Sequence, residues 1–158
     1  MVPEMASGVV AEREATESAR RALFFARYEA SHFGSPNIET EHLLLGLMRQ
    51  AKEHRELFFP SPAAPDNVRK QIEAHTIIRE KVSTSVDLPL SNEVKRALAN
   101  GAEEAKRLAT KHIAVEHLLL GLLGEEGSFA ARILREQGAE PDSIRGALAT
   151  APQTPAED

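Results

Sequence analysis

Cysteine is absent from the 158 residues of this chain, which excludes disulfide scaffolds, thiolate zinc sites and cysteine nucleophiles. No apolar run approaches the length of a membrane-spanning helix, and the first residues lack the pattern of a secretory signal. No long lysine or arginine run occurs, and the formal net charge is -5, so nothing attracts nucleic acid in general. We therefore expect a cytoplasmic protein that binds neither membranes nor nucleic acid.

Hydrophobic residues make up 42% of the chain, which favours a folded globule, and their spacing favours helices. Apolar residues recur at i, i+3, i+4 and i+7 over 16–33, where Thr16 is placed to cap the helix. A second helix is expected to begin with Thr40 as its N-cap and Glu41 in its first turn, followed by the apolar run Leu43–Met48. No alternation typical of strands persists, so we predict an all-α fold.

Later segments continue this pattern. A short third helix is predicted over roughly Lys52–Phe59, and Asp66 is expected to cap a fourth helix that runs toward Glu80. Lys81–Leu90 is polar, β-branched and contains a proline, so we interpret it as a linker. Ser91 is then placed to cap a fifth helix.

The chain contains one pattern twice. The run Glu41–Leu47 is identical to Glu116–Leu122 at a constant offset of 75 residues, and six further identities precede these runs. Pro65–Arg69 resembles Pro141–Arg145 in the same way. Two such copies would share a core, because one copy alone is too small to bury its leucines. We expect flexible tails at 1–12 and 150–158 around a double-repeat domain at 13–149, with repeat one at 16–80, the linker at 81–90 and repeat two at 91–149.

The repeated signature is an alanine-rich helix followed by I-x-x-E-H-L-L-L-G-L. It resembles the amino-terminal double-repeat domain of Clp-type AAA+ unfoldases, the ClpC branch in particular, over about Thr16–Leu148. The resemblance implies about eight helices in two four-helix repeats related by a pseudo-twofold axis. In that family the domain recruits adaptors and substrates for an ATP-driven unfolding ring. No G-x-x-x-x-G-K-[ST] phosphate loop occurs, so we expect a stand-alone recruiting domain without cofactor or ATPase activity.

In that family the repeated motif is commonly G-T-E-H, and the resemblance implies that its glutamates belong to pockets for phosphorylated arginine. Thr40-Glu41 and Val115-Glu116 stand at the matching positions. A carboxylate can pair with guanidinium, while helix N-terminal amides and a hydroxyl hold the phosphate. The chain departs from the motif, because Glu39 and Ala114 replace the glycine and Val115 replaces the threonine. In the alternative interpretation, Thr40 caps the helix and both glutamates serve its dipole.

The histidines next to these glutamates do not form a recognisable metal motif. His112, Glu116 and His117 have the spacing H-x-x-x-E-H, which differs from H-x-x-E-H of the inverted zinc proteases, and His112 precedes the expected helix. Because His42 and His117 occupy the same place in the two repeats, we interpret both as structural. We predict no metal site and no catalytic residue.

The repeats differ at Phe24 and Tyr28, whose counterparts in repeat two are Ala99 and Glu103. At about 100° per residue, the two aromatic residues lie opposite the core stripe of the first helix and adjoin one another as an i, i+4 pair. Adjacent exposed aromatics often mark a protein contact. The alternative is that Val9 and Val10, or the other repeat, cover them.

These features favour a non-catalytic protein-binding module, an adaptor or substrate-recognition factor for a Clp-type unfoldase–protease. Its expected partners are the unfoldase or its client proteins, with Phe24, Tyr28, Thr40, Glu41 and Glu116 as candidate contacts. Three other hypotheses stay open. The chain could be a decoy that sequesters ligands of the unfoldase's own domain, including small toxic molecules. It could be an accessory subunit that forms a homodimer, or, with the least support, an unrecognised enzyme.

Overall fold

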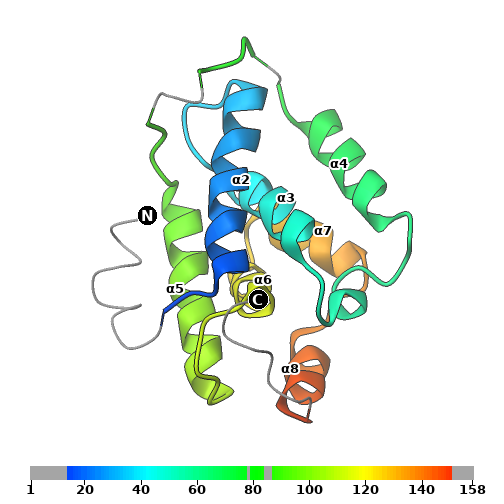
Figure 1. Cartoon of the computed structure of the whole chain (residues 1–158). Coiled ribbons are helices and arrows are strands. Elements are labelled where there is room, and N and C mark those ends of the chain that lie inside the picture. Colours follow the sequence, from blue (N-terminus) through cyan, green and yellow to red (C-terminus); the bar gives the residue numbers. More distant parts are fainter. Residues whose placement is uncertain (1–13, 78, 84–86, 151–158) are drawn as a thin grey trace.

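The computed structural model describes residues 14–77, 79–83 and 87–150. Within these ranges the chain forms seven α-helices and one 3-10 turn, and no β-strand (Figure 1). In chain order, the elements are α2 (Glu17–Phe33), α3 (Thr40–Gln50), η1 (Arg55–Leu57), α4 (Ala64–His75), α5 (Asn92–Arg107), α6 (Val115–Gly124), α7 (Phe129–Glu136) and α8 (Pro141–Thr150). None of these helices is long and apolar enough to cross a membrane.

The prediction of an all-α double repeat is confirmed. Repeat one contains α2, α3, η1 and α4, and repeat two contains α5, α6, α7 and α8, so each repeat has four helical elements in the same order. Of the tails expected at 1–12 and 150–158, residues 1–12, including Val9 and Val10, and residues 151–158 lie outside the described residues. The second tail begins one residue later than predicted, because Thr150 is the last residue of α8.

The core lies where the second helices of the two repeats meet. Both α3 and α6 contact the first helix of their own repeat and also contact each other, and Figure 1 shows α4 and α8 toward the outside. The leucines of both runs are buried, as expected for helices that are apolar nearly all round. Gly46 brings α3 onto α2, because a Cβ there would lie 2.2 Å from the carbonyl oxygen of Ala22. Gly121 meets Ala97 in the same way on α5.

Short backbone contacts join the two repeats. The amide of Ile38 donates to the carbonyl of Pro89 at 2.8 Å, and the amide of Ser91 donates to the carbonyl of Ile38 at 3.0 Å. The loop before α3 is thereby fixed to the loop before α5. The loops before α2 and α6 repeat this arrangement, since the amide of Thr16 donates to the carbonyl of Ile113 at 2.9 Å. The end of the predicted linker is therefore part of the packed structure.

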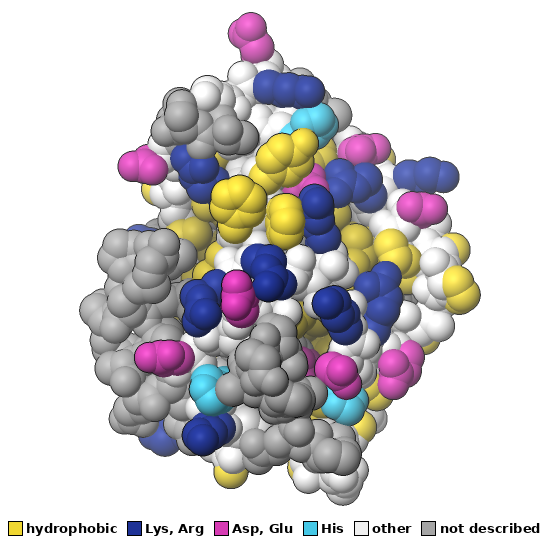
Figure 2. Space-filling model, in the orientation of Figure 1, with side chains coloured by type: hydrophobic (Ala, Val, Ile, Leu, Met, Phe, Trp, Pro, Cys, Tyr) yellow, Lys and Arg dark blue, Asp and Glu magenta, His cyan; other side chains and the backbone are white. Residues whose placement is uncertain are grey.

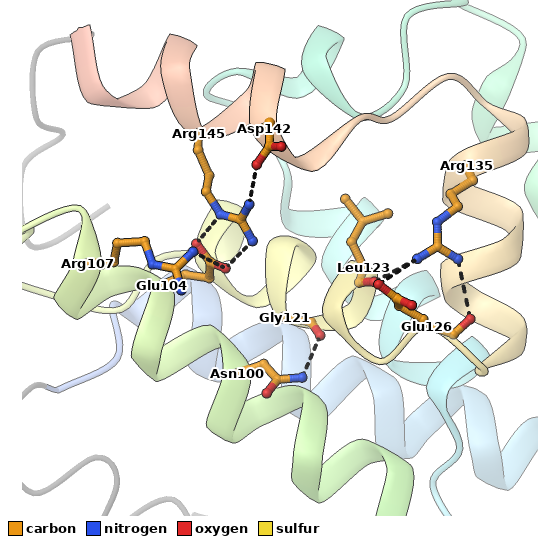
Figure 3. Close-up of polar contacts among 9 residues, drawn as sticks. All are labelled: Asn100, Glu104, Arg107, Gly121, Leu123, Glu126, Arg135, Asp142 and Arg145. Carbon is orange, nitrogen blue, oxygen red and sulfur yellow. Dashed lines mark hydrogen bonds and ion pairs between the residues drawn. The ribbon is translucent and has the colours of Figure 1, made fainter.

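Each repeat also holds its first helix to its last by an ion pair. In repeat two, the Arg145 guanidinium donates to both carboxylate oxygens of Glu104, at 2.9 and 2.7 Å (Figure 3). Arg69 on α4 pairs with Glu29 on α2 in the same two-pronged way. Both glutamates are buried, so the pairing satisfies charges that would otherwise be costly inside the protein.

Two predicted helix caps are confirmed and others are wrong. The hydroxyls of Thr16 and Ser91 accept hydrogen bonds from the amides of Ala19 and Val94, as expected for N-caps. Thr40 is not an N-cap: Glu39 occupies that position and Thr40 is the first helical residue. The reason is that the capping interaction comes from within the helix. The ring of His42, the third helical residue, accepts a hydrogen bond from the amide of Glu39.

The segments after α3 also differ from expectation. The helix predicted over Lys52–Phe59 is a single 3-10 turn, η1, with Phe58 and Phe59 buried behind it. The next helix begins at Ala64 rather than after Asp66, because Pro65 fits the first turn of a helix and Asp66 lies inside that turn. The same helix ends at His75 and does not reach Glu80.

Candidate functional site

The start of α3 is built around His42. The Nδ1 atom of its ring accepts a hydrogen bond from the Glu39 amide at 2.9 Å, so the ring proton resides on Nε2. That Nε2 atom is buried and has no hydrogen-bond partner among the described residues. Burial lowers the pKa of His42 to about 4, which keeps the ring neutral near pH 7. The histidine is therefore a structural residue, as the repeat predicted.

The carboxylate of Glu41 sits at the same helix start in an acidic setting. Burial raises its pKa, and the nearby charges of Glu39 and Glu93 raise it further. The Thr40 hydroxyl is itself buried and donates to Glu41 Oε1 at 3.4 Å, which opposes the rise. Glu41 thus lies near the charges of two other carboxylates, and the Thr40 hydroxyl points to it.

The start of α6 has the same backbone arrangement with different side chains. The Ala114 amide donates to His117 Nδ1 at 2.8 Å, and His117 Nε2 lies 3.3 Å from the Thr110 hydroxyl. Val115 is buried and Glu116 is half-buried. In both repeats, the amide before the helix is already used by a histidine, so it is not available to an anion. The structure brings Glu41 and Glu116 to equivalent places at the starts of α3 and α6.

The outer face of α2 is where the repeats differ most. Phe24 is 64% exposed and Tyr28 is 45% exposed, so the predicted exposure of both rings is confirmed and repeat two does not cover them. The counterpart positions carry Ala99, which is half-buried, and Glu103, which is exposed.

Three more residues, which the sequence analysis did not single out, belong to this face. The Phe24 ring meets the Phe25 ring edge-on, with centroids 5.5 Å apart, and the Tyr28 ring stacks on His32 at 6.2 Å. The guanidinium of Arg49, on α3, lies 3.8 Å from the centre of the Phe25 ring. We call Phe24, Phe25, Tyr28 and His32 the aromatic stripe. Figure 2 shows hydrophobic side chains clustered over α2 with lysine or arginine side chains around them.

The repeat offset contained a signal for the missed residues. Phe25, His32 and Arg49 align with Asn100, Arg107 and Gly124. Every ring of the stripe is thus replaced by a non-aromatic residue in repeat two. The difference between the two repeats at every position of the first helix therefore identifies all four residues of the aromatic stripe.

Outside the helix starts and the outer face of α2, the described surface gives little support for catalysis or metal binding. A hollow along α7 is lined by Phe129, Arg132 and Arg135, with Glu126 and Glu136 beside them. Its hydroxyl residue, Ser128, caps α7 by accepting from the Ala131 amide. Across the described ranges, no group of three or more histidine and acidic residues is placed to hold a metal ion.

Comparisons with known proteins agree with this architecture. The family described as "Clp repeat (R) N-terminal domain" matches residues 14–137 and, again, 90–155. The chloroplastic chaperone protein ClpC1 of rice (Oryza sativa subsp. japonica) is 36% identical over 132 residues. The negative regulator of genetic competence ClpC/MecB of Bacillus subtilis is 32% identical over 135 residues. Each alignment covers 82% of this chain, but only 14% of the rice protein and 16% of the Bacillus protein.

Solved structures show the same fold. The N-terminal domain of the chaperone ClpD from Arabidopsis thaliana superposes with a TM-score of 0.67 at 29% identity, covering 86% of this chain and 94% of that domain. A structure titled as part of a malarial protein secretion system reaches a TM-score of 0.74 over 85% of this chain and 92% of its own, at 20% identity. The double repeat, its central leucine runs and these matches agree, and the chain belongs to the Clp repeat N-terminal domain family.

Proposed function

We propose that this chain is a non-catalytic protein-recognition module that acts as an adaptor or substrate-recognition factor for a Clp-type unfoldase–protease. The observation that carries the proposal is the aromatic stripe on α2, which is exposed in one repeat and missing from the other. The fold accounts for the residues that the repeats share. It does not require Phe24 and Tyr28, since the equivalent helix is built with alanine and glutamate.

The helix starts support a structural role more than phosphoarginine binding. At the first start, the additional carboxylates of Glu39 and Glu93 repel a phosphate, and at the second, Val115 offers no hydroxyl. A role of Thr40, Glu41 and Glu116 in partner binding stays a prediction. So does the cytoplasmic location, since the rice relative is named as chloroplastic.

Affinity capture with variants tests the proposal. The bait would be the wild-type chain, the double variant Phe24→Ala/Tyr28→Ala, and the matched control Glu103→Ala at the position equivalent to Tyr28. We expect the wild type and Glu103→Ala to retain the same enriched proteins, and the double variant to lose them while its circular dichroism is unchanged. A folded double variant that keeps every partner would overturn the proposed surface.

Two further measurements separate the adaptor from its alternatives. An adaptor changes the rate at which a purified Clp unfoldase–protease degrades the captured clients. A decoy binds the ligand without docking to the ring and leaves that rate unchanged when the ligand is absent. An accessory homodimer shows a mass in solution that rises with protein concentration.

A further inference from the structure

We propose that the aromatic stripe and the arginines beside it form a docking surface for an acidic segment of another protein that carries at least one large apolar side chain. This inference rests on the proposed function and adds the chemistry of the partner. Three observations carry it: the exposed rings, the position of the arginines, and the contrast with repeat two.

The rings supply a preorganised apolar surface. Phe24 contacts Phe25 edge-on and Tyr28 stacks on His32, so neighbouring rings hold each other before a partner arrives. Aromatic residues with few rotatable bonds bury much area at little entropic cost, which is why they dominate protein-binding surfaces. An apolar side chain laid across Phe24 and Tyr28 would remove from water two rings that are 64% and 45% exposed.

Arginines lie along both edges of the stripe. At 100° per residue, Arg20 and Arg27 fall on one side of Phe24, and Arg21 falls beside Phe25 on the other. Arg49 reaches the Phe25 ring from α3. Figure 2 shows hydrophobic side chains over α2 with basic side chains, and a few acidic ones, around them. A segment that crosses the stripe would therefore meet a guanidinium on either side.

Two of the arginines beside the stripe, Arg21 and Arg27, already have exposed carboxylate partners. Glu17 lies 3.5 Å from Arg21, and Asp87 lies 3.9 Å from Arg27, and both acidic side chains are exposed. Such surface pairs contribute little and exchange readily for other partners. In the described portion of the chain, no carboxylate lies within ion-pair distance of Arg49, which stacks on a ring instead. Arginines held on aromatic faces remain able to bind carboxylates.

Part of this face is specific to repeat one, although Lys95 and Arg96 keep the positive charges of Arg20 and Arg21 in repeat two. Ala102 and Gly124 stand where repeat one has Arg27 and Arg49, and Glu103 stands in place of Tyr28. The whole chain carries a net charge of -5, and the arginines that combine with exposed rings are those of α2 and the end of α3. Local positive charge on an acidic protein favours an acidic partner and speeds its association.

The same charges argue against a second copy as the occupant. In a twofold dimer through this face, the stripe of one copy would meet the stripe of the other, and the arginines would oppose each other. An acidic segment removes this repulsion and supplies the apolar anchor as well. The partner is therefore expected to be a different protein.

Peptide binding tests the inference on the full chain. The probe is a short fluorescein-labelled peptide that alternates aspartate with leucine and phenylalanine, followed by fluorescence anisotropy. One control peptide has lysine in place of each aspartate, and another has serine in place of each apolar residue. We expect the acidic apolar peptide to bind at least about tenfold more tightly than either control, and more weakly as salt is added.

Matched protein variants locate the site. Arg49→Glu reverses one charge beside the stripe, whereas Arg132→Glu makes the same change on α7, where Arg132 also lies over a ring, 5.0 Å from the centre of Phe129. We expect Arg49→Glu to weaken binding about tenfold, and Arg132→Glu to leave it unchanged. Both variants should unfold at the same temperature as the wild type, since both arginines are exposed.

The inference is overturned if the lysine peptide binds as well as the acidic one, or if Arg49→Glu and Arg132→Glu behave alike. It is also overturned if the protein instead binds vesicles of phosphatidylserine, or if its mass rises with concentration in a way that Phe24→Ala/Tyr28→Ala abolishes. If no peptide binds, but captured partners still depend on Phe24 and Tyr28, the acidic chemistry is wrong and the proposed function stands. If neither peptide binding nor the capture of partners depends on the stripe, both proposals fail.

Discussion

The carboxylate of Glu29 accepts two hydrogen bonds from the guanidinium of Arg69, at 3.2 and 2.7 Å, across 40 residues of chain. Glu29 is buried on α2, while the Arg69 side chain remains 41% exposed at the edge of α4. The hydrogen bond to Glu29 raises the pKa of the Arg69 guanidinium. Glu104 and Arg145 repeat this arrangement, so the pair is a structural element of the fold and lies apart from the surfaces proposed for binding.

Arg69→Ala is expected to lower the free energy of unfolding by about 2 kcal/mol, because it leaves a buried carboxylate without its partner. Urea unfolding at neutral pH measures the loss. Arg132→Ala is the control, since Arg132 is exposed and has no ion-pair partner among the described residues; its cost should stay within about 0.5 kcal/mol. Equal costs for the two variants would contradict the importance of the pair.

Gly46→Ala is expected to destabilise the protein by about 3 kcal/mol, because the added methyl group would overlap the carbonyl of Ala22 and push α3 away from α2. Thermal and urea unfolding report the change. Gly127→Ala adds the same methyl group where nothing lies within 4 Å, and it should be nearly neutral. If Gly46→Ala is tolerated as well as Gly127→Ala, the helices do not approach as closely as described.

Acid should weaken the fold through His42. Its folded pKa is lowered to about 4 by burial, whereas an unfolded histidine titrates near 6.5. Between these two pKa values, His42 is protonated in the unfolded chain but neutral in the folded chain. The free energy of unfolding therefore rises with pH across this window. Stability is therefore complete above pH 6.5 and falls by at most about 3 kcal/mol as the pH drops to 4.

Urea unfolding of the wild type and of His42→Gln between pH 7 and about 4 isolates this contribution. Glutamine can still accept the Glu39 amide from the third helical position, but it does not titrate. We expect the variant to lose less stability with acid than the wild type does. Parallel pH profiles would show that burial of His42 does not govern this pH dependence.

Two threonines should respond differently to the same substitution. Thr16→Val removes the oxygen that accepts the Ala19 amide, and it is expected to cost about 1 kcal/mol. Thr40→Val removes only a long hydrogen bond to Glu41 and installs the residue that repeat two carries at Val115. Its cost should stay below about 0.5 kcal/mol. A larger loss from Thr40→Val than from Thr16→Val would restore Thr40 as the cap of its helix.

Local rules and the repeat predicted much of the fold. Thr16 and Ser91 cap their helices because a hydroxyl beside free amides forms a hydrogen bond within one turn. The identical leucine runs predicted two buried central helices, and Phe24 and Tyr28 were predicted to be exposed because helical periodicity alone determines which face they share.

The errors have a common physical origin. Residue type favours Thr40 as a cap, but the ring of His42, inside the helix, accepts the hydrogen bond of the amide that precedes it. The helix expected over Lys52–Phe59 is reduced to η1, because Phe58 and Phe59 both turn into the core. Where side chains three or more residues apart compete for one backbone group or one cavity, propensity does not decide the outcome.

The sequence by itself determined the double repeat, the helical class, the buried leucines and the exposure of Phe24 and Tyr28, because these depend on periodicity and on identity between the copies. Only the tertiary structure decided that Arg49 from α3 covers Phe25 and that Glu29 pairs with Arg69. It also decided that Glu93 raises the pKa of Glu41 across the repeat boundary. Such pairings depend on how α2, α3, α4 and α5 pack, and no spacing along the chain encodes the distance between side chains on different helices.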